Sequence, residues 1–404
     1  MENPKIRFKG FTKDWEQRKL GDLVNRITRK NQDLVSELPL TISAQYGLID
    51  QNEFFDKRVA SKDVSGYYLI ENGEFAYNKS TSTDAPWGAI KRLDRYENGV
   101  LSTLYIVFGI KENNLVDSDF LVSYYSTNLW HKGIHEIAAE GARNHGLLNI
   151  APADFFETKL MIPQDIEEQK KIGKYFEELD HLITLHQRKC DQTKNLKKYM
   201  LQKMFPQNGA KVPEIRFDGY TYDWEQRKLG DYLEVSKEKN RDEGFGKEDV
   251  LSVSGEFGIV NQIEFQGRSF AGASVKNYGV VEVFDIVYTK SPLKSNPYGI
   301  IKTNKGKAGI VSTLYAVYKP KNNVDSEFIQ IYFELDSRMN SYMHPLVNKG
   351  AKNDMKVSDE NALKGPVIFP RIEEQKMISQ YFSNLDHLIT LHQRQHKLHL
   401  NMLL

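Results

Sequence analysis

Two kinds of side-chain pair suited to nucleic-acid contact occur twice in this sequence, about 206 to 211 positions apart. The first is a Lys-Ser pair directly after a predicted strand. The second is an Arg-Asn or Lys-Asn pair directly after Gly-Ala. These residues are Lys79, Ser80, Arg143 and Asn144 in the first copy and Lys290, Ser291, Lys352 and Asn353 in the second. Lysine with a hydroxyl can hold a phosphate, whereas arginine or lysine pairs with guanine and asparagine with adenine. The pattern favours DNA contact, with solvated loop lysines and a helix-ending turn as the alternatives.

Another segment in each copy places cations just after an aromatic residue. Lys91 and Arg92 follow Trp87, and Lys302 follows Tyr298. The three cations could bind phosphates. Because a glycine follows each aromatic ring, we favour packing in a turn for Trp87 and Tyr298 over contact with a base or sugar.

No motif for catalysis accompanies these residues. The sequence has no Gly-x-x-x-x-Gly-Lys-Ser/Thr phosphate loop and no Asn-Pro-Pro-Tyr/Phe methyltransferase tetrapeptide. No cluster of histidine, cysteine and carboxylate residues has metal-ligand spacing. His186 and His392 stand on long helices, five residues after His181 and His387, which favours helix packing over a metal site. We therefore expect no catalytic residues, no metal and no cofactor.

The elements that position these residues come from a tandem repeat. PKIRFKGFTKDWEQRKLGD begins at Pro4 and PEIRFDGYTYDWEQRKLGD at Pro213, and IEEQK…LDHLITLHQR begins at Ile166 and Ile372. The ends of the copies are almost identical, whereas the interiors share only scattered anchors. Each interior is typical of short strands with a few helices, including helices capped at Asp117 and Asp325. The ends are therefore interpreted as shared scaffold, and the interiors as the variable part of each copy.

A long helix with an apolar seam is expected at the end of each copy. The residues expected to pack the two helices together are Ile172, Phe176, Leu179 and Ile183 in the first and Ile378, Phe382, Leu385 and Ile389 in the second. Their spacing of four and three residues is heptad-like. The helices would be roughly 55–60 Å and 50 Å long. Because such helices are marginal alone, we expect an antiparallel pair and a pseudo-two-fold relation between the halves.

The chain therefore divides into four expected parts. Residues 1–163 and 208–370 are expected to form two globular domains, and residues 164–207 and 371–404 two spacer helices. The expected fold class is α/β (α+β), with two mixed domains joined by long antiparallel coiled-coil helices.

Composition limits the class of protein. The 404 residues carry a net charge of +1, so any DNA-binding face must be local. Cys190 is the only cysteine, which fits a reducing cytoplasm. We find neither an apolar run long enough for a membrane span nor a signal peptide.

The doubled pattern resembles the specificity subunit of type I restriction-modification systems. The resemblance rests on WEQRKLGD at both module starts, on the two IEEQK…LDHLITLHQR helices and on Tyr-x-Lys-Ser…Pro-Trp/Tyr-Gly-x-Ile-Lys in each reader. It covers nearly the whole chain. The first helix ends in KKYMLQKMF, and the second departs from the family pattern because it stops at HLNMLL.

This resemblance implies a non-catalytic subunit in which residues 1–163 and 208–370 are two target-recognition domains. Each would read half of an asymmetric, bipartite site in double-stranded DNA. It further implies that the helices set the gap and dock two methyltransferase subunits, and that restriction/translocase subunits can join. A two-headed scaffold that binds only protein is the alternative, favoured by the low net charge. An enzyme with an unrecognised site is a second alternative.

Overall fold

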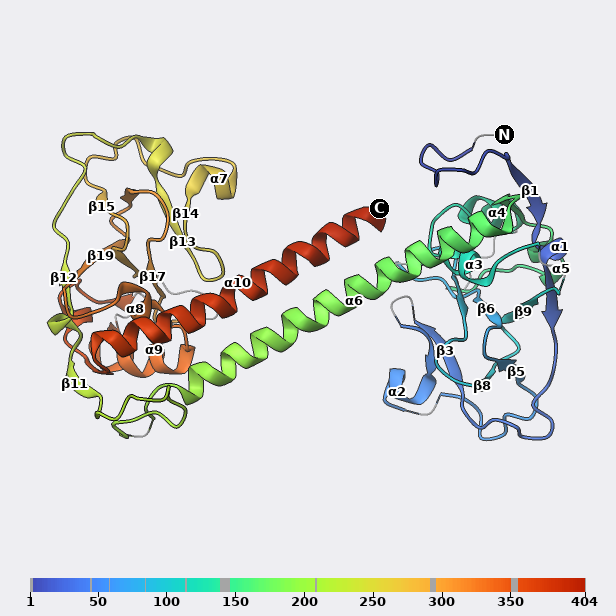
Figure 1. The fold of residues 1–404 in the computed structure, drawn as a ribbon, viewed down its shortest axis with the longest axis horizontal. Helices are drawn as coiled ribbons and strands as arrows, with labels where there is room; N and C mark the ends of the chain where they lie inside the picture. Colours follow the sequence, from blue (N-terminus) through green and yellow to red (C-terminus); the bar gives the residue numbers. More distant parts are fainter. Residues whose placement is uncertain are drawn as a thin grey trace. The chain divides into compact units, whose positions relative to one another are not determined.

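The computed structural model describes residues 3–43, 46–57, 59–83, 85–112, 115–138, 146–207, 209–290, 296–349 and 355–403. It divides into two compact units. The first comprises residues 1–184 with 399–404, and the second comprises residues 185–398. Figure 1 traces the chain and labels its elements. We describe each unit separately.

The first unit is built on a four-stranded antiparallel sheet. Its order is β2 (Val24–Ile27), β9 (Ile106–Ile110), β6 (Phe75–Asn78) and β7 (Ala89–Arg92). Three further antiparallel pairs are β1 (Trp15–Lys19) with β10 (Lys159–Pro163), β3 (Leu40–Ser43) with β4 (Gly47–Asp50), and β5 (Tyr68–Glu71) with β8 (Asn98–Leu101). The short helices are α1 (Leu20–Leu23), α2 (Gln51–Phe55), α3 (Ser118–Tyr125), α4 (His131–Ile137) and α5 (Pro152–Phe156).

The second unit repeats this plan. Its four-stranded sheet has the order β12 (Leu233–Val235), β19 (Tyr315–Pro320), β16 (Ile286–Thr289) and β17 (Ile301–Thr303). The paired strands are β11 (Glu225–Lys228) with β22 (Pro366–Phe369), β13 (Leu251–Ser254) with β14 (Gly258–Asn261), β15 (Gly279–Val281) with β18 (Gly309–Val311), and β20 (Asn348–Lys349) with β21 (Met355–Lys356). The helices are α7 (Gln262–Gln266), α8 (Ser326–Tyr332) and α9 (Asp336–Met343), with single 3-10 turns at Leu229–Asp231, Lys247–Asp249, His344–Leu346 and Asn361–Leu363. The mixed helix-and-sheet class is confirmed.

Two long helices follow the two sheet domains in sequence, namely α6 (Ile166–Lys203) and α10 (Ile372–Leu403), as Figure 1 shows. A buried glutamine fixes the start of each helix. Gln169 accepts a hydrogen bond from the backbone N–H of Asp117 and donates one to the carbonyl of Pro163. Gln375 makes the same two bonds with Asp325 and Pro370. Each long helix is thereby tied to the N-terminus of a capped short helix.

Asp117 and Asp325 cap those short helices, as predicted. The Asp117 carboxylate accepts from the N–H groups of Asp119 and Phe120 at 3.0 Å, and Asp325 accepts from Phe328 at 3.0 Å. Such bonds satisfy N–H groups that have no partner within the helix. Local sequence therefore specifies where α3 and α8 begin.

Within the second unit, the C-terminal half of α6 runs antiparallel to α10. His186 lies against His392, and Lys197 lies against Asp386, so numbers rise along one helix as they fall along the other. Phe382 is fully buried, with Ile378 and Leu385, in the core of this unit. Packing of the predicted seam along the whole length of both helices stays a prediction.

Candidate nucleic-acid interface

The predicted cations lie at equivalent places in the two sheets. Lys91 is paired with Ala76 across β7 and β6, and Lys302 is paired with Val287 across β17 and β16. β7 and β17 each form the outer strand of a four-stranded sheet. Lys79 and Lys290 come directly after β6 and β16. The fold therefore gives each unit the same two cationic positions beside one edge strand.

The Lys79-Ser80 segment is held next to a second predicted contact segment. The N–H of Leu148 donates to the carbonyl of Lys79 at 2.9 Å, and that of Thr81 donates to Gly146 at 2.7 Å. Arg143 and Asn144 precede this segment by a few residues but lie outside the described residues. Ser80 is exposed, whereas the ammonium group of Lys79 lies 3.4 Å from the carbonyl of Ile150. Burial lowers the pKa of Lys79.

The second unit presents the equivalent lysine differently. The ammonium group of Lys290 donates to the carboxylate of Asp359 at 3.0 Å, and both side chains are partly exposed. Ser291, Lys352 and Asn353 lie outside the described residues. A phosphate at Lys290 would therefore compete with a carboxylate of the protein itself.

Arg92 and the two edge-strand lysines are engaged within their own units. The Arg92 guanidinium donates to Asp94 at 2.6 Å and to Asp119 at 2.7 Å, which ties β7 to α3. Burial lowers the pKa of Lys91, and the negative charge of Asp180 on α6 opposes that effect. Lys302 is 8% exposed, and burial lowers its pKa too. DNA contact by these three residues stays a prediction, and it would require the side chains to leave these surroundings.

The aromatic residues beside the glycines pack in turns. The Tyr77 hydroxyl donates to the carbonyl of Trp87 at 2.8 Å, and the Tyr288 hydroxyl donates to that of Tyr298 at 2.9 Å. Burial raises the pKa of both hydroxyls. The glycine that follows each aromatic residue has a positive φ of 79° or 75°. A Cβ at Gly88 would lie 2.2 Å from the carbonyl oxygen of Asn78. This repeated turn therefore needs glycine, and its aromatic ring faces the protein.

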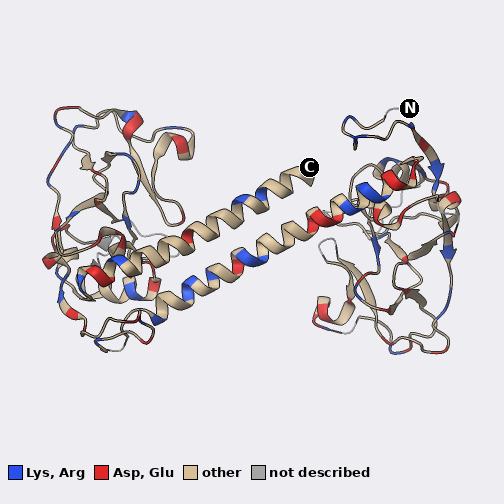
Figure 2. Ribbon diagram, viewed as in Figure 1, with Lys and Arg blue, Asp and Glu red and all other residues tan. Residues whose placement is uncertain are grey.

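One buried charged cluster was not predicted from the sequence. In the second unit the ammonium group of Lys197 lies 2.6 Å from Glu334 and 2.6 Å from Asp386. Lys197 stands in a charge run that Figure 2 shows along the C-terminal half of α6. The other cations of this run, including Lys194 and Lys198, are exposed. Only the three-dimensional contacts distinguish Lys197 from its neighbours.

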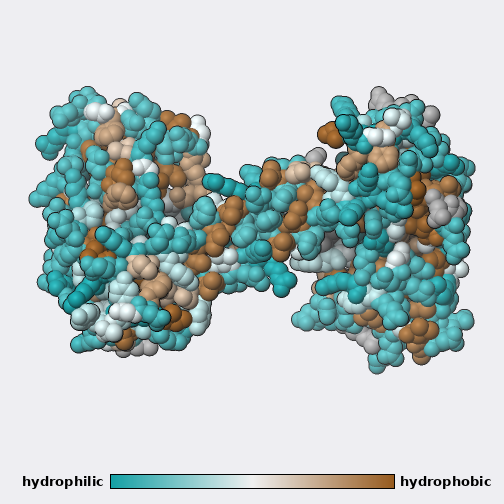
Figure 3. All heavy atoms as spheres, in the orientation of Figure 1, coloured by the Kyte–Doolittle hydropathy of each residue, from teal (hydrophilic) through white to brown (hydrophobic). Residues whose placement is uncertain are grey.

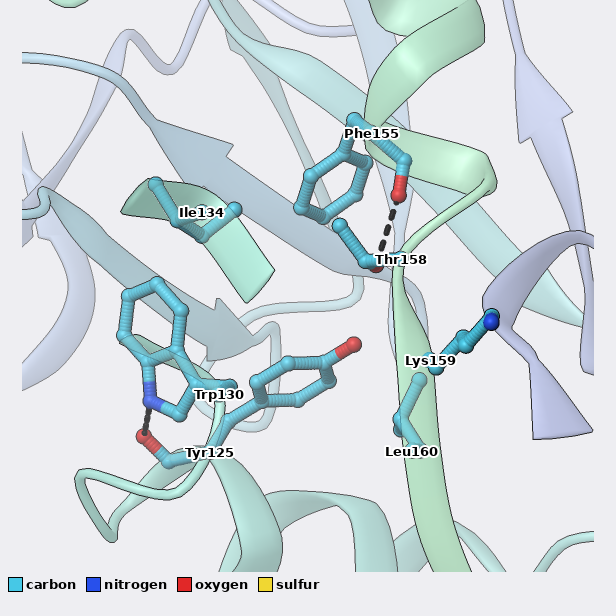
Figure 4. Close-up of a pocket in the computed structure, with 7 residues that line it drawn as sticks. All are labelled: Tyr125, Trp130, Ile134, Phe155, Thr158, Lys159 and Leu160. Atoms are coloured by element: carbon cyan, nitrogen blue, oxygen red, sulfur yellow. Dashed lines mark hydrogen bonds between the residues drawn. The ribbon is translucent and has the colours of Figure 1, made fainter. Parts of the chain in front are cut away.

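A small cavity in the first unit does not fit a substrate. It has a volume of about 10 Å³ and is lined by Tyr125, Trp130, Phe155 and Leu160 among others. Figure 4 shows the Tyr125 ring beside the cavity and two hydrogen bonds, from Trp130 to the Tyr125 carbonyl and from Thr158 to the Phe155 carbonyl. A space of this size holds at most about one water molecule.

Among the described residues, no group of three or more histidine, cysteine or carboxylate side chains could hold a metal ion. No helix in that part of the chain is both long enough and apolar enough to cross a membrane.

Comparison with known proteins identifies relatives of this architecture. Residues 12–195 match the family model for the type I restriction modification DNA specificity domain. A Methanocaldococcus jannaschii protein that carries the name of a type I restriction enzyme MjaX specificity subunit is 23% identical over 412 residues. That match covers 95% of this chain and 89% of the relative.

One solved structure shows the same fold as this chain, and a second is similar over most of its length. The S subunit of a type I restriction-modification system from M. genitalium matches all of this chain and 97% of its own, with a TM-score of 0.56 and 13% identity. The HsdS subunit from Thermoanaerobacter tengcongensis matches 96% of this chain and 95% of its own, with a TM-score of 0.46 and 16% identity.

Proposed function

The chain resembles the specificity subunit of a type I restriction-modification system, and from this premise we propose that it selects the DNA site of such a complex. Residues 1–163 and 208–370 are the two target-recognition domains in this proposal. Each reads one half of an asymmetric, bipartite site in double-stranded DNA. The helices at 164–207 and 371–404 set the gap between the halves.

The observation that carries the proposal is the repeated four-stranded sheet, in which Lys91 and Lys302 occupy equivalent positions on the outer strand. The orders β2-β9-β6-β7 and β12-β19-β16-β17 match element by element. Outside these matched positions the two interiors have different sequences. Two domains with the same sheet order but different surface side chains would recognise two different half-sites. The reason is that the side chains that reach the base edges distinguish one base pair from another.

The proposed DNA contacts are those that the repeat predicts. They are Lys79, Ser80, Lys91, Arg92, Arg143 and Asn144 in the first reader and Lys290, Ser291, Lys302, Lys352 and Asn353 in the second. Exposure favours Ser80 for immediate contact. The other described members, which contact protein groups, would act after local rearrangement.

The proposed partners supply the chemistry. Two methyltransferase subunits dock on the helices, restriction/translocase subunits join them, and the specificity subunit itself is non-catalytic. The long helices expose leucines such as Leu388, Leu391 and Leu398, and Figure 3 shows hydrophobic residues on the helical surface. Apolar surface of this kind is typical of protein contacts. The cytoplasmic location expected from the single cysteine belongs to the same proposal.

A mobility-shift experiment with the co-expressed methyltransferase tests this function. We expect the complex to prefer one duplex sequence, and the preference to persist at moderate salt while overall affinity falls. Lys79→Ala with Ser80→Ala should weaken that preference, whereas Lys62→Ala with Ser61→Ala provides a matched control in the same unit. A complex that binds every duplex equally, or none, would favour the protein-only scaffold.

A further inference from the structure

Three apolar side chains lie exposed beside the short helix α7 in the second unit. The rings of Phe257, in the turn between β13 and β14, and of Phe265, on α7, lie 5.4 Å apart between centroids. The backbone N–H of Phe270 donates to the side chain of Gln262 at 2.6 Å, which holds Phe270 beside the same helix. We define the apolar patch of this unit as Phe257, Phe265 and Phe270, which are 59%, 46% and 55% exposed.

The first unit has an apolar patch at the same sequence positions. Its members are Tyr46, Phe54 and Val59, each 211 positions before its counterpart, and they are 60%, 47% and 53% exposed. The short helices concerned, α2 and α7, each lie beside a hairpin of their own unit (Figure 1). The near-equal exposures show that neither unit buries these side chains in its own core.

Repeated hydrogen bonds hold the backbone of both patches in place. The N–H of Tyr46 donates to the Ser43 hydroxyl at 3.2 Å, and that of Phe257 donates to the Ser254 hydroxyl at 3.1 Å. The two short helices are also capped at equivalent positions, by the side chains of Asp50 and Asn261. Side chains on a fixed backbone lose less entropy on binding than side chains on a mobile one. The two patches are therefore well prepared for contact with a partner.

The repetition of the patches indicates a partner that is the same for both units. A buried residue can recur in both units because the fold requires it, but the fold does not require an exposed apolar side chain. Exposed apolar and aromatic side chains that gather in one place are typical of protein contacts. Because most of the two interiors differ in sequence, a surface that recurs in both suits a partner that meets each unit in the same way.

The charge of the two patch segments disfavours DNA as that partner. Residues 46–59 carry three carboxylates and two cations, and residues 257–270 carry one of each, so neither segment has a net positive charge. A surface that binds DNA neutralises phosphates with lysine and arginine. Side chains that read bases would in addition differ between two readers of different half-sites. A protein with an apolar contact surface fits both patches better.

We propose, on the basis of the function proposed above, that each patch docks the methyltransferase subunit that serves its reader. One copy of that subunit contacts Tyr46, Phe54 and Val59, and the other contacts the corresponding three phenylalanines. The same apolar surface of the methyltransferase accepts both sets, because all six side chains are uncharged and five of the six are aromatic. This contact lies on the readers and is separate from the docking on the long helices.

Calorimetric titration of the full-length chain with the purified methyltransferase subunit, without DNA, tests this proposal. Phe54→Ser with Phe265→Ser should weaken both binding events by about tenfold or more, as expected for central aromatic contacts. Phe54→Leu with Phe265→Leu keeps the apolar surface and should bind more tightly than the serine variant. Phe54→Ser alone should weaken one of the two binding events and leave the other unchanged.

A matched control separates the patches from exposed apolar surface in general. Leu129→Ser with Val283→Ser changes one exposed apolar residue outside the patch in each unit, and it should bind the methyltransferase as the unmodified chain does. Because the substituted phenylalanines are about half exposed, all these variants should keep the fold, which an unchanged Tm checks.

Four outcomes would overturn the proposal. Equal binding by the unmodified chain and the Phe54→Ser, Phe265→Ser variant would overturn it and leave the proposed function intact, whereas an unmodified chain that binds no methyltransferase would overturn both. Normal assembly of that variant with a loss of affinity for every duplex would assign the patches to DNA. Self-association of the chain that the variant abolishes would assign them to a second copy of the chain.

Discussion

The Nδ1 atom of His186 lies 3.2 Å from the Nδ1 atom of His392, and the two residues occupy the same position in the two long helices. At this distance one ring must donate a proton and the other must accept it. The pair is thus a direct helix-to-helix contact within the second unit. It accounts for two of the repeated histidines without a metal.

We expect His392→Lys to weaken this contact. Its permanent positive charge would face the His186 ring, whereas His392→Asn keeps a group that can donate and accept. The lysine variant should lose about 1 kcal/mol of unfolding free energy, the net value of one hydrogen bond, and the asparagine variant less. Urea denaturation followed by tryptophan fluorescence measures both. Equal losses would show that the imidazole pair contributes only its packing.

Phe205→Ala should strongly destabilise the second unit. The ring is 1% exposed and lies among Trp224, Phe328 and Phe382, so removing it leaves a cavity that costs roughly 3–5 kcal/mol. Ile6→Ala, at a position that is 90% exposed, should change stability by less than about 0.5 kcal/mol. Calorimetry can compare the two variants, and similar losses of stability would contradict the difference in burial between the two positions.

Lys197 gives the second unit a dependence on alkaline pH. Burial lowers the pKa of Lys197, but attraction to Glu334 and Asp386 outweighs it and raises the pKa above the ordinary value of 10.5. The folded state therefore holds the proton more tightly, so the stabilisation is complete below pH 10.5 and is lost as the pH rises through the raised pKa.

Lys197→Met should accordingly cost about 1–2 kcal/mol at neutral pH, less than a fully buried pair because Asp386 is partly exposed. The difference from the unmodified protein should shrink above pH 10.5. Lys198→Met, at the exposed neighbouring position, is the control. Guanidinium titrations at several pH values measure the difference in unfolding free energy between Lys197→Met and the unmodified protein. A difference that does not change with pH would contradict a role for the charge of Lys197.

Exchange of residues 1–160 for another reader should change one half of the methylated site. The expectation follows from two readers of matching sheet order but different interiors. Genome-wide mapping of methylated adenines in a host that expresses the exchanged subunit provides the measurement. Changes in both halves would contradict the two-reader proposal.

Matched insertions should lengthen the gap between the half-sites. Four residues are inserted after Arg188 in α6 and four after Arg394 in α10, so that both helices lengthen by the same amount. Each insertion adds about 6 Å of helix, or roughly two base pairs at 3.4 Å each. Methylation mapping again reads the gap. If the gap keeps its length, the helices do not determine it.

The sequence by itself determined the repeat, the mixed fold class, the capped starts of α3 and α8 and the existence of both long helices. These features depend on local patterns, such as an aspartate before an apolar run or a four-three spacing, that act within a few residues. The identical IEEQ motif also marked Gln169 and Gln375, although only the structure showed that they tie each long helix to a cap.

Tertiary structure decided which charged side chains form ion pairs within the protein and which stay exposed to solvent. Lys197 and Lys198 are neighbours in one cationic run, yet Lys197 is buried between carboxylates that are 137 and 189 residues away in sequence. Arg92 on β7 likewise donates a hydrogen bond to Asp119 on α3, 27 residues away in sequence. Burial depends on what the rest of the chain brings to a residue, and no local spacing specifies that.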